Sequence, residues 1–212
     1  MGIKERKERE KLIRRKQIKI AAKEEFTRKG FHLTSMEDIA NRVELSPATI
    51  YLYFKSKEEL FASMTLDTIK YMLKQVEKIC NNNKLSIEEK ILGLKVALYK
   101  AYKFDPLIIP NILHFQIRNT LSDLSNEMLK EINDNTRKIM EMIGEIYNDG
   151  VCQGKFIEAK AITIVDIIWG TFSGLFVWLE AKRRVDPSKD YFKLTLNKAF
   201  DIFLKGIEKQ KS

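Results

Sequence analysis

Hydroxyl and aromatic side chains lie close together in a short segment that begins at Ser46: Thr49, Tyr51 and Tyr53. Their hydroxyls can bond phosphate oxygens or base edges, while the apolar Pro47 and Ala48 suit contact with thymine methyl groups. Ser46 is a helix N-cap and Pro47 a first helical residue, so a helix of about two turns is predicted. A helix this short is unstable alone in water, so its neighbours must support it. A short, braced helix of this composition suits the major groove of DNA.

The helices expected on either side of this segment have their own start signals. Thr34 and Ser35 open the preceding helix, and Thr34 and Glu37 have the spacing of a capping box. Ser56 and Glu59 repeat that spacing and start a long helix over residues 57–80. The short helix is therefore expected between two others, each with an N-terminus that can hold a phosphate oxygen.

A further helix is predicted upstream, over about residues 8–29. Ile18, Ala22 and Phe26 recur every four residues and form one apolar stripe. We expect the helix to end at Gly30, because glycine tolerates the left-handed conformation needed just after a helix. Phe31 can then fold back onto the helix as a hydrophobic contact. These patterns predict a three-helix unit at the N-terminus.

The rest of the chain also reads as helical. Capping signals, proline and glycine predict helices over about residues 86–104, 106–120, 125–150, 160–183 and 190–210. With the four upstream, that makes about nine helices, without a strand pattern or an internal repeat. The sequence therefore predicts an all-α protein.

The charge of the chain is uneven. Its net charge is +9, and residues 1–29 contain twelve Lys/Arg and five Glu, a net +7 of that total. Basic charge beside a candidate DNA helix fits phosphate binding. A solvated helix end explains it equally well, and binding to another polyanion or to a membrane surface would look similar. Residues 4–9 are either an arm that reaches DNA or a disordered end.

Metal, cofactor and enzyme chemistry find no support in the residue pattern. Cys80 and Cys152 lack metal-ligand spacing, and the two histidines are far apart, so no metal site and no cofactor are expected. No nucleophile-base pair or phosphate-binding glycine loop is present. The apolar stretch 161–179 is interrupted by Asp166 and predicts a buried helix rather than a membrane span. Without a signal-peptide pattern, a cytoplasmic protein is expected.

The chain resembles a known family, the TetR-type (tetracycline-repressor-like) transcriptional regulators. The resemblance covers about residues 12–61, and it rests on a helix-turn-helix signature of these residues: Ser46, Thr49, Ile50, Tyr51, Tyr53, Phe54, Ser56, Lys57, Glu58 and Leu60. Glu44 departs from the pattern, because family members usually carry glycine there. If the turn needs a positive φ, glutamate costs about 1 kcal/mol or more.

The resemblance implies a role for each residue of the segment. Thr49, Tyr53 and Lys57 would contact phosphates, while Pro47, Ala48 and Tyr51 would face the bases. Glu37 occupies a position where some members read a base, although most surface glutamates do nothing of the kind. The predicted DNA-binding residues are Thr34, Ser35, Glu37, Ser46, Pro47, Ala48, Thr49, Tyr51, Tyr53, Lys55 and Lys57.

The resemblance also implies a second domain. Residues 1–56 would form the DNA-binding domain, and residues 57–212 a domain that binds a small-molecule effector and forms a homodimer. Helical aromatic and Met residues are more often plain core than pocket lining, but they supply the effector-site candidates: Tyr99, Phe104, His114, Phe115, Arg118, Met140, Tyr147, Trp169 and Phe172. His114 and Arg118 could orient an anionic ligand.

Two helices are candidates for the dimer interface. The helix over 160–183 is apolar nearly all round, so it must be covered on several sides, by the domain or by a second copy. Gly170 and Gly174 give it a flat strip where another helix could approach. The predicted interface residues are Gly170, Gly174, Trp178, Leu196, Phe200, Phe203 and Leu204.

Three classes of function fit the sequence to different degrees. A dimeric regulator would bind a pseudo-palindromic double-stranded DNA operator, most commonly as a repressor, and release it when a small apolar or amphipathic effector binds. A helical carrier of apolar ligands would explain the apolar helices but not residues 46–57. An enzyme is disfavoured, and no membrane partner is expected.

Overall fold

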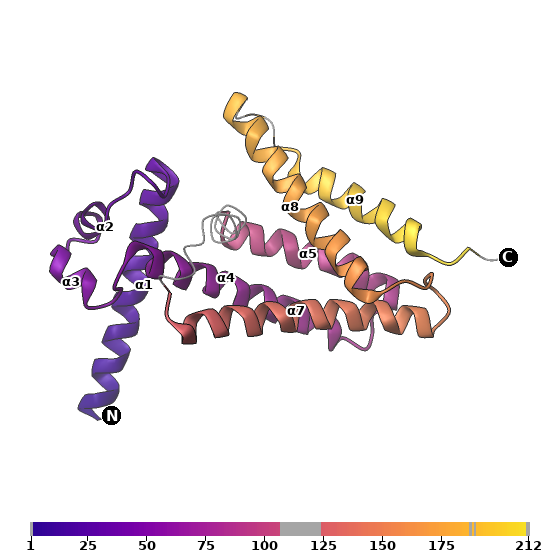
Figure 1. The fold of residues 1–212 in the computed structure, drawn as a ribbon, viewed down its shortest axis with the longest axis horizontal. Coiled ribbons are helices and arrows are strands. Elements are labelled where there is room, and N and C mark those ends of the chain that lie inside the picture. The colour runs from indigo at the N-terminus through magenta and orange to yellow at the C-terminus, as the bar shows by residue number, and fades with distance from the viewer. Residues whose placement is uncertain (1, 107–123, 187, 189, 211–212) are drawn as a thin grey trace.

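The computed structural model describes residues 2–106, 124–186, 188 and 190–210. Over that part of the chain the fold consists of helices (Figure 1). Their bounds are α1 Ile3–Lys29, α2 Met36–Arg42, α3 Pro47–Tyr51, α4 Lys57–Cys80, α5 Ile87–Phe104, α7 Asn126–Cys152, α8 Ala161–Val185 and α9 Phe192–Ile207. The helix predicted over 106–120 lies almost wholly outside the described residues. The all-α prediction is confirmed.

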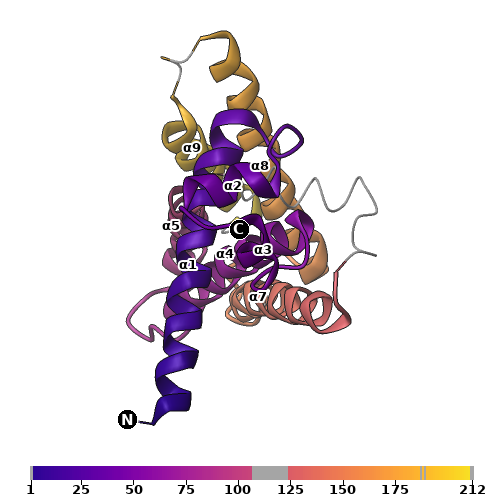
Figure 2. The same ribbon diagram turned by 90° about the vertical axis from the view of Figure 1, so that its left-hand side faces the viewer.

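The helices form two groups, which α4 connects. Helices α1, α2 and α3 gather at one end of the molecule, and α4 runs from them into the layer formed with α5 and α7 (Figure 1). Helix α8 packs on α7, and α9 packs on α5 and α8. The N-terminal half of α1 projects past α2 and α3 (Figure 2).

Two hydrophobic cores correspond to the two groups. We call the first the N-terminal core, and its buried residues are Ile18, Ala21, Ala22, Phe26, Met36, Ile39, Ala40, Ile50, Phe54, Leu60, Phe61, Ala62, Met64 and Leu124. The second, the C-terminal core, joins α4, α5, α7, α8 and α9. Because Leu60, Phe61, Ala62 and Met64 belong to the first core, packing of the N-terminal unit continues past residue 56. The exact domain boundary stays a prediction.

Several predicted helix ends need correction. Helix α1 begins at Ile3 rather than near residue 8, so residues 4–9 are helical in this structure. Ser35, not Thr34, caps α2, and its partner in the capping box is Asp38. Ser56 caps α4, but the Glu59 carboxylate accepts from the Lys55 amide and not from Ser56. The last helix is shorter than predicted and spans Phe192–Ile207.

Helix α8 is strongly apolar in composition. Residues Ala161–Arg183 are long and apolar enough to cross a membrane, with a mean hydropathy of 1.7. The core helix of a soluble protein passes the same test. One side of α8 is buried in the C-terminal core, through Ile164, Val165, Ile168 and Phe172. That packing supports the prediction of a core helix.

Candidate nucleic-acid interface and effector cavity

Helix α3 is held by its two ends and by its buried face. The Ser46 Oγ accepts a hydrogen bond from the Thr49 amide at 3.1 Å. Ile50 and Phe54 have no exposed surface and anchor α3 in the N-terminal core. Only Ile50 of the five helical residues is buried, so the remainder of the helix is available for contact.

The opposite face of α3 presents the residues that the sequence assigned to base contact. Pro47 and Ala48 are exposed, and Tyr51 is 51% and Leu52 77% exposed. Thr49 is half-buried, and its hydroxyl lies 2.7 Å from that of Ser46. The structure thus gathers these side chains on one surface. Sequence reasoning missed Leu52, although it directly follows Tyr51.

The end of α3 is braced by α1. The guanidinium of Arg15 donates to the Tyr53 carbonyl oxygen and lies over the Phe54 ring, 4.0 Å from its centroid. A cation over a ring face is attracted by the ring's quadrupole. This contact leaves the Tyr53 side chain half-buried beside the exposed surface, where it remains a predicted phosphate contact.

The turn between α2 and α3 has the positive φ at Glu44 that the sequence had left open. Glu44 has φ 55°, the one positive φ among the described non-glycine residues. The Leu45 amide donates to the Ala40 carbonyl oxygen at 2.9 Å and closes the turn. A left-handed conformation costs a residue with a Cβ about 1–2 kcal/mol. This turn therefore carries backbone strain at the position where the family usually has glycine.

The N-terminus of α2 is organised around Asp38. Its carboxylate accepts from the Lys29 Nζ at 2.6 Å and from the Ser35 amide at 2.9 Å. The hydrogen bond from Lys29, followed by those from Ser35, lowers the pKa of Asp38 far below its usual range. Ser35 and Glu37 remain exposed, so both can meet DNA at this end of the helix.

Thr34 does not fit its predicted role. Its side chain is 2% exposed, and its hydroxyl donates to the Gly30 carbonyl oxygen at 2.8 Å. The prediction that this hydroxyl contacts phosphate is wrong, because the hydroxyl is buried and bonded within the loop that joins α1 to α2. Ser35, the next residue, takes the exposed position instead.

Lys57 also has partners inside the protein. Its Nζ donates to the carbonyl oxygens of Phe31 at 2.8 Å and Thr34 at 2.7 Å, and it lies 4.5 Å from the centroid of the Phe31 ring. Lys57 therefore ties the start of α4 to the loop before α2. A phosphate contact by this residue stays a prediction, as does one by the exposed Lys55.

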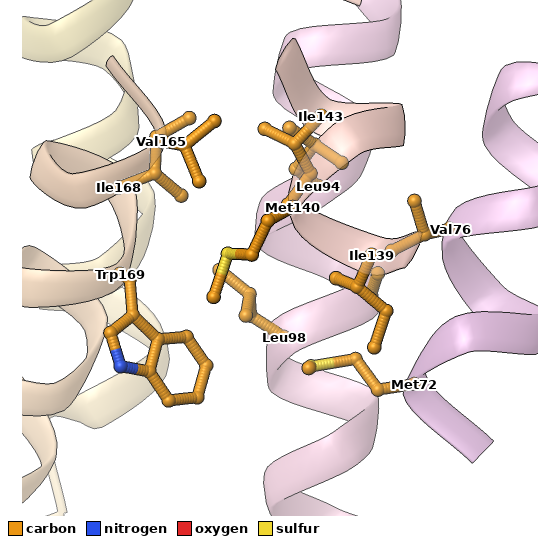
Figure 3. Close-up of a pocket in the computed structure, with 11 residues that line it drawn as sticks. Met72, Val76, Leu94, Leu98, Ile139, Met140, Ile143, Val165, Ile168 and Trp169 are labelled. Carbon is orange, nitrogen blue, oxygen red and sulfur yellow. The ribbon is translucent and has the colours of Figure 1, made fainter. Parts of the chain in front are cut away.

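A small apolar cavity lies between α4, α5, α7 and α8 (Figure 3). Its volume is about 10 Å³, room for at most one water molecule. The lining residues are Met72, Val76, Leu94, Ala97, Leu98, Ile139, Met140, Ile143, Val165, Ile168 and Trp169. Figure 3 shows the Met140 side chain extending between Leu98 and Trp169. Met72 and Met140 are unbranched, so both side chains can adopt other rotamers and change the shape of the lining.

Of the predicted effector-site residues that the structure describes, only Met140 and Trp169 line this cavity. Phe172 and Tyr147 have no exposed surface and are core residues, and Tyr147 donates to the Ile157 carbonyl oxygen at 2.5 Å. The Phe104 ring stacks on the Tyr71 ring, with the two ring centroids 4.4 Å apart. The Tyr99 ring packs beside the Phe192 ring. His114, Phe115 and Arg118 lie outside the described residues.

The predicted dimer surface divides into two sets. Gly170 and Gly174 are exposed, with nothing within 4 Å of an added Cβ, and Trp178 is 60% exposed. Phe203 is half-buried against the C-terminal core. The prediction is wrong for three residues, whose side chains point into the core of their own chain: Leu196, Phe200 and Leu204.

The exposed surface of α3, supported by α1, α2 and α4, is that of a helix-turn-helix DNA-binding protein. Comparison with known proteins agrees: residues 20–64 match the family described as "Bacterial regulatory proteins, tetR family". The match places a DNA-binding domain of the TetR type at residues 20–64 of this chain.

Similar proteins extend the likeness beyond the N-terminal domain. The "Fatty acid metabolism regulator protein" of Bacillus subtilis is 26% identical over 157 residues, 73% of this chain and 77% of that protein. The solved structure of the TetR-family regulator PfmR from Thermus thermophilus superposes with a TM-score of 0.74 at 23% identity, covering 91% of this chain and 99% of that one. That of FadR from Bacillus subtilis with stearoyl-CoA gives 0.67 at 21% identity, covering 90% and 98%. These structures share the fold.

Proposed function

We propose that this protein is a cytoplasmic repressor that binds a pseudo-palindromic DNA operator as a homodimer and leaves it when an effector binds. The observation that carries the proposal is the division of α3 into a buried and an exposed face. Ile50 and Phe54 anchor it, while Pro47, Ala48 and Tyr51 face outward. A carrier of apolar ligands would have no use for that division.

On DNA, α3 would lie in the major groove. Pro47 and Ala48 would contact thymine methyl groups, and the Tyr51 hydroxyl or ring would contact a base edge. Phosphate contacts would come from the exposed or half-buried polar side chains beside α3: Ser35, Ser46, Thr49, Tyr53, Lys55 and Lys57. Glu37, exposed on α2, would accept from cytosine N4 if it reaches a base.

The homodimer would form through the uncovered face of α8. Ile167 and Val177 are each 46% exposed and Trp178 is 60% exposed. Gly170 and Gly174 lie between them along the helix and leave open space above their backbone. Leu194 and Ile202 of α9 add exposed apolar surface, at 69% and 62%. Apolar surface of this extent is typical of an interface between subunits.

The effector would enter between α5, α7 and α8. The cavity there is lined by apolar side chains and has a volume of only about 10 Å³, so binding would require Met140 and Trp169 to move and the helices to part. The relative from Bacillus subtilis is named a fatty acid metabolism regulator, and the structure of FadR was solved with stearoyl-CoA. Both support an effector with a long apolar chain, such as a fatty acyl compound.

Helix α4 would transmit the effect to DNA. Met72 and Val76 line the cavity, whereas Leu60 lies in the N-terminal core. A second link joins the end of α5 to α1: the Lys23 Nζ donates to the Phe104 carbonyl oxygen at 2.7 Å and lies 3.5 Å from the Asp105 carboxylate. An effector that parts α4 from α5 would therefore change the position of the DNA-binding helices. The energetic coupling equals the ligand's differential affinity for the two arrangements.

The test is a DNA-binding titration with two kinds of duplex. Duplexes from the DNA flanking the coding region and a random duplex of equal length are titrated by fluorescence anisotropy. A regulator should bind one flanking sequence at least about 1000-fold more tightly than random DNA. Equal affinity for both would reject the proposal and favour the carrier.

The same assay tests the effector. Stearoyl-CoA, stearate and coenzyme A are added separately to the bound complex. Release by the acyl compounds but not by coenzyme A supports a site for the apolar chain. If a compound binds the protein while operator affinity stays unchanged, the proposed coupling is wrong.

A further inference from the structure

We infer that the projecting N-terminal half of α1 is a second DNA-binding surface, which lies along the phosphate backbone beside the α3 contact. The inference rests on the proposed DNA-binding function and adds a surface to it. The first buried residue of α1 is Ile18, so residues 3–17 have no buried side chain, which is unusual for so long a stretch of helix. At 1.5 Å per residue that half of the helix is about 22 Å long.

The charge of this segment points to an anionic partner. Residues 3–17 contain eight Lys/Arg and three Glu, a net charge of +5. An isolated helix of this length is marginal in water, and its close positive charges repel one another. A negatively charged partner would remove that repulsion, as a protein surface without acidic groups would not.

Helix periodicity shows on which face of α1 these basic side chains lie. Lys7, Lys11 and Arg14 are spaced i, i+4 and i+7, and Ile18 continues the same line by four more residues. The face that is apolar and packed in the second half of α1 is therefore basic in the first half. It faces the side on which α1 braces α3.

A surface hollow confirms this placement. It is lined by Lys7, Glu10, Lys11, Arg14, Leu52 and Tyr53, so the basic stripe and the end of α3 border the same space. Glu10 forms an ion pair with Arg6 at 3.5 Å, which partly neutralises the one acidic group there. A duplex that fills its major groove with α3 would pass next to this hollow.

The dimensions suit the backbone of a duplex. Lys7 and Arg14 are about 10 Å apart along the helix axis, which corresponds to about three nucleotides at 3.4 Å per nucleotide on one strand. Three positive side chains along that distance can each meet a phosphate. Phosphate contacts of this kind carry no sequence information; they add affinity and fix the orientation of the protein.

The experiment compares two variants that lose the same charge from opposite faces of α1. The first is Lys7→Gln with Lys11→Gln, on the stripe toward α3. The matched control is Arg9→Gln with Lys16→Gln, on the far face. Glutamine has nearly the helix propensity of Lys and Arg, so both variants should keep the helix. Circular dichroism checks that they do.

Salt dependence gives the decisive measurement. Affinities are measured from 50 to 200 mM salt on a flanking-region duplex and on a random duplex. Loss of two phosphate contacts should reduce the slope of log affinity against log salt by about 1.8 per bound subunit, a relative change of about 12-fold across this range. The control variant should keep a slope close to that of the wild-type protein.

Each other outcome has a defined meaning. Equal reductions in both variants would indicate diffuse attraction and overturn the surface. An unchanged slope in the first variant, while Tyr51→Ala weakens binding, would overturn the surface and leave the proposed function standing. Absence of sequence preference in the wild-type protein would reject the proposed function, and the slopes on random DNA would still decide the surface.

Discussion

Gly150 and Gly144 lie on the same helix, α7, and the structure predicts opposite effects when each is replaced by alanine. At Gly150 an added Cβ would lie 2.1 Å from Cδ2 and 2.3 Å from Cε2 of Phe156. That ring is 1% exposed and stacked on Tyr147 at a centroid distance of 5.9 Å, so it has little room to move. Overpacking of this kind costs about 1–3 kcal/mol.

The helix itself partly offsets that cost. Alanine is favoured over glycine in a helix by about 1 kcal/mol, so Gly150→Ala should lose about 1–2 kcal/mol of unfolding free energy, the upper end of the overpacking range dominating. For a chain of this size each kcal/mol corresponds to about 2–4 °C in melting temperature. The expected decrease is therefore about 2–8 °C.

Gly144→Ala is the matched control. Its Cβ would lie 3.5 Å from the Ala161 Cβ and 3.9 Å from Val165 Cγ2, which are ordinary contacts. Only the helix term remains, so this variant should gain about 0.5–1 kcal/mol. Urea and thermal unfolding followed by circular dichroism measure both. A Gly150→Ala protein as stable as Gly144→Ala would refute the packing of Phe156 against α7.

Three further predictions concern function and pH. Tyr51→Ala should weaken operator binding by about 1–3 kcal/mol without lowering thermal stability, since that side chain is half exposed; anisotropy and melting curves separate the two. Asp38→Asn should lower stability at neutral pH, because the hydrogen bond from Lys29 holds the folded-state pKa of Asp38 below 3.8. The stability from Asp38 is present above that pH and lost as the pH falls, so urea unfolding of the variant should depend less on pH between 5 and 2. Lys23→Met should leave operator affinity intact but reduce its response to stearoyl-CoA, measured in the same titration.

The N-terminal fold was largely predictable because its signals are local. Ser46 and Pro47 specify where α3 begins, and the stripe of Ile18, Ala22 and Phe26 identifies the buried face of α1. Glu44 could be identified as a departure from the pattern that would be strained if the turn had a positive φ, because the family it resembles usually has glycine there. Each of these predictions depends on a few adjacent residues, and the structure contains each feature.

The errors arose where neighbouring residues could perform the same task. Thr34 and Ser35 are both good N-caps, and only the packing of the preceding loop decides that Thr34 turns inward. Likewise, periodicity identifies the apolar stripe of α9 but cannot say whether it faces the chain's own core or a second copy. Phe200 faces the core, whereas Trp178 on α8 remains exposed. Tertiary packing settles both choices, and it leaves no local trace in the sequence.

The construction of α4 bears on how a ligand signal could reach DNA. Helix α4 passes from the N-terminal core to the C-terminal core, and the buried Thr65 and Thr68 lie between the two. Their hydroxyls donate to the carbonyl oxygens of Phe61 and Met64, respectively. Such bonds to the preceding turn often bend helices, so α4 has a defined place to bend. Movement of its cavity-lining end would be taken up there, and the Lys57 end would carry the loop before α2 with it through its two carbonyl bonds. We therefore expect the effector to reorient α2 and α3 together rather than to unfold either.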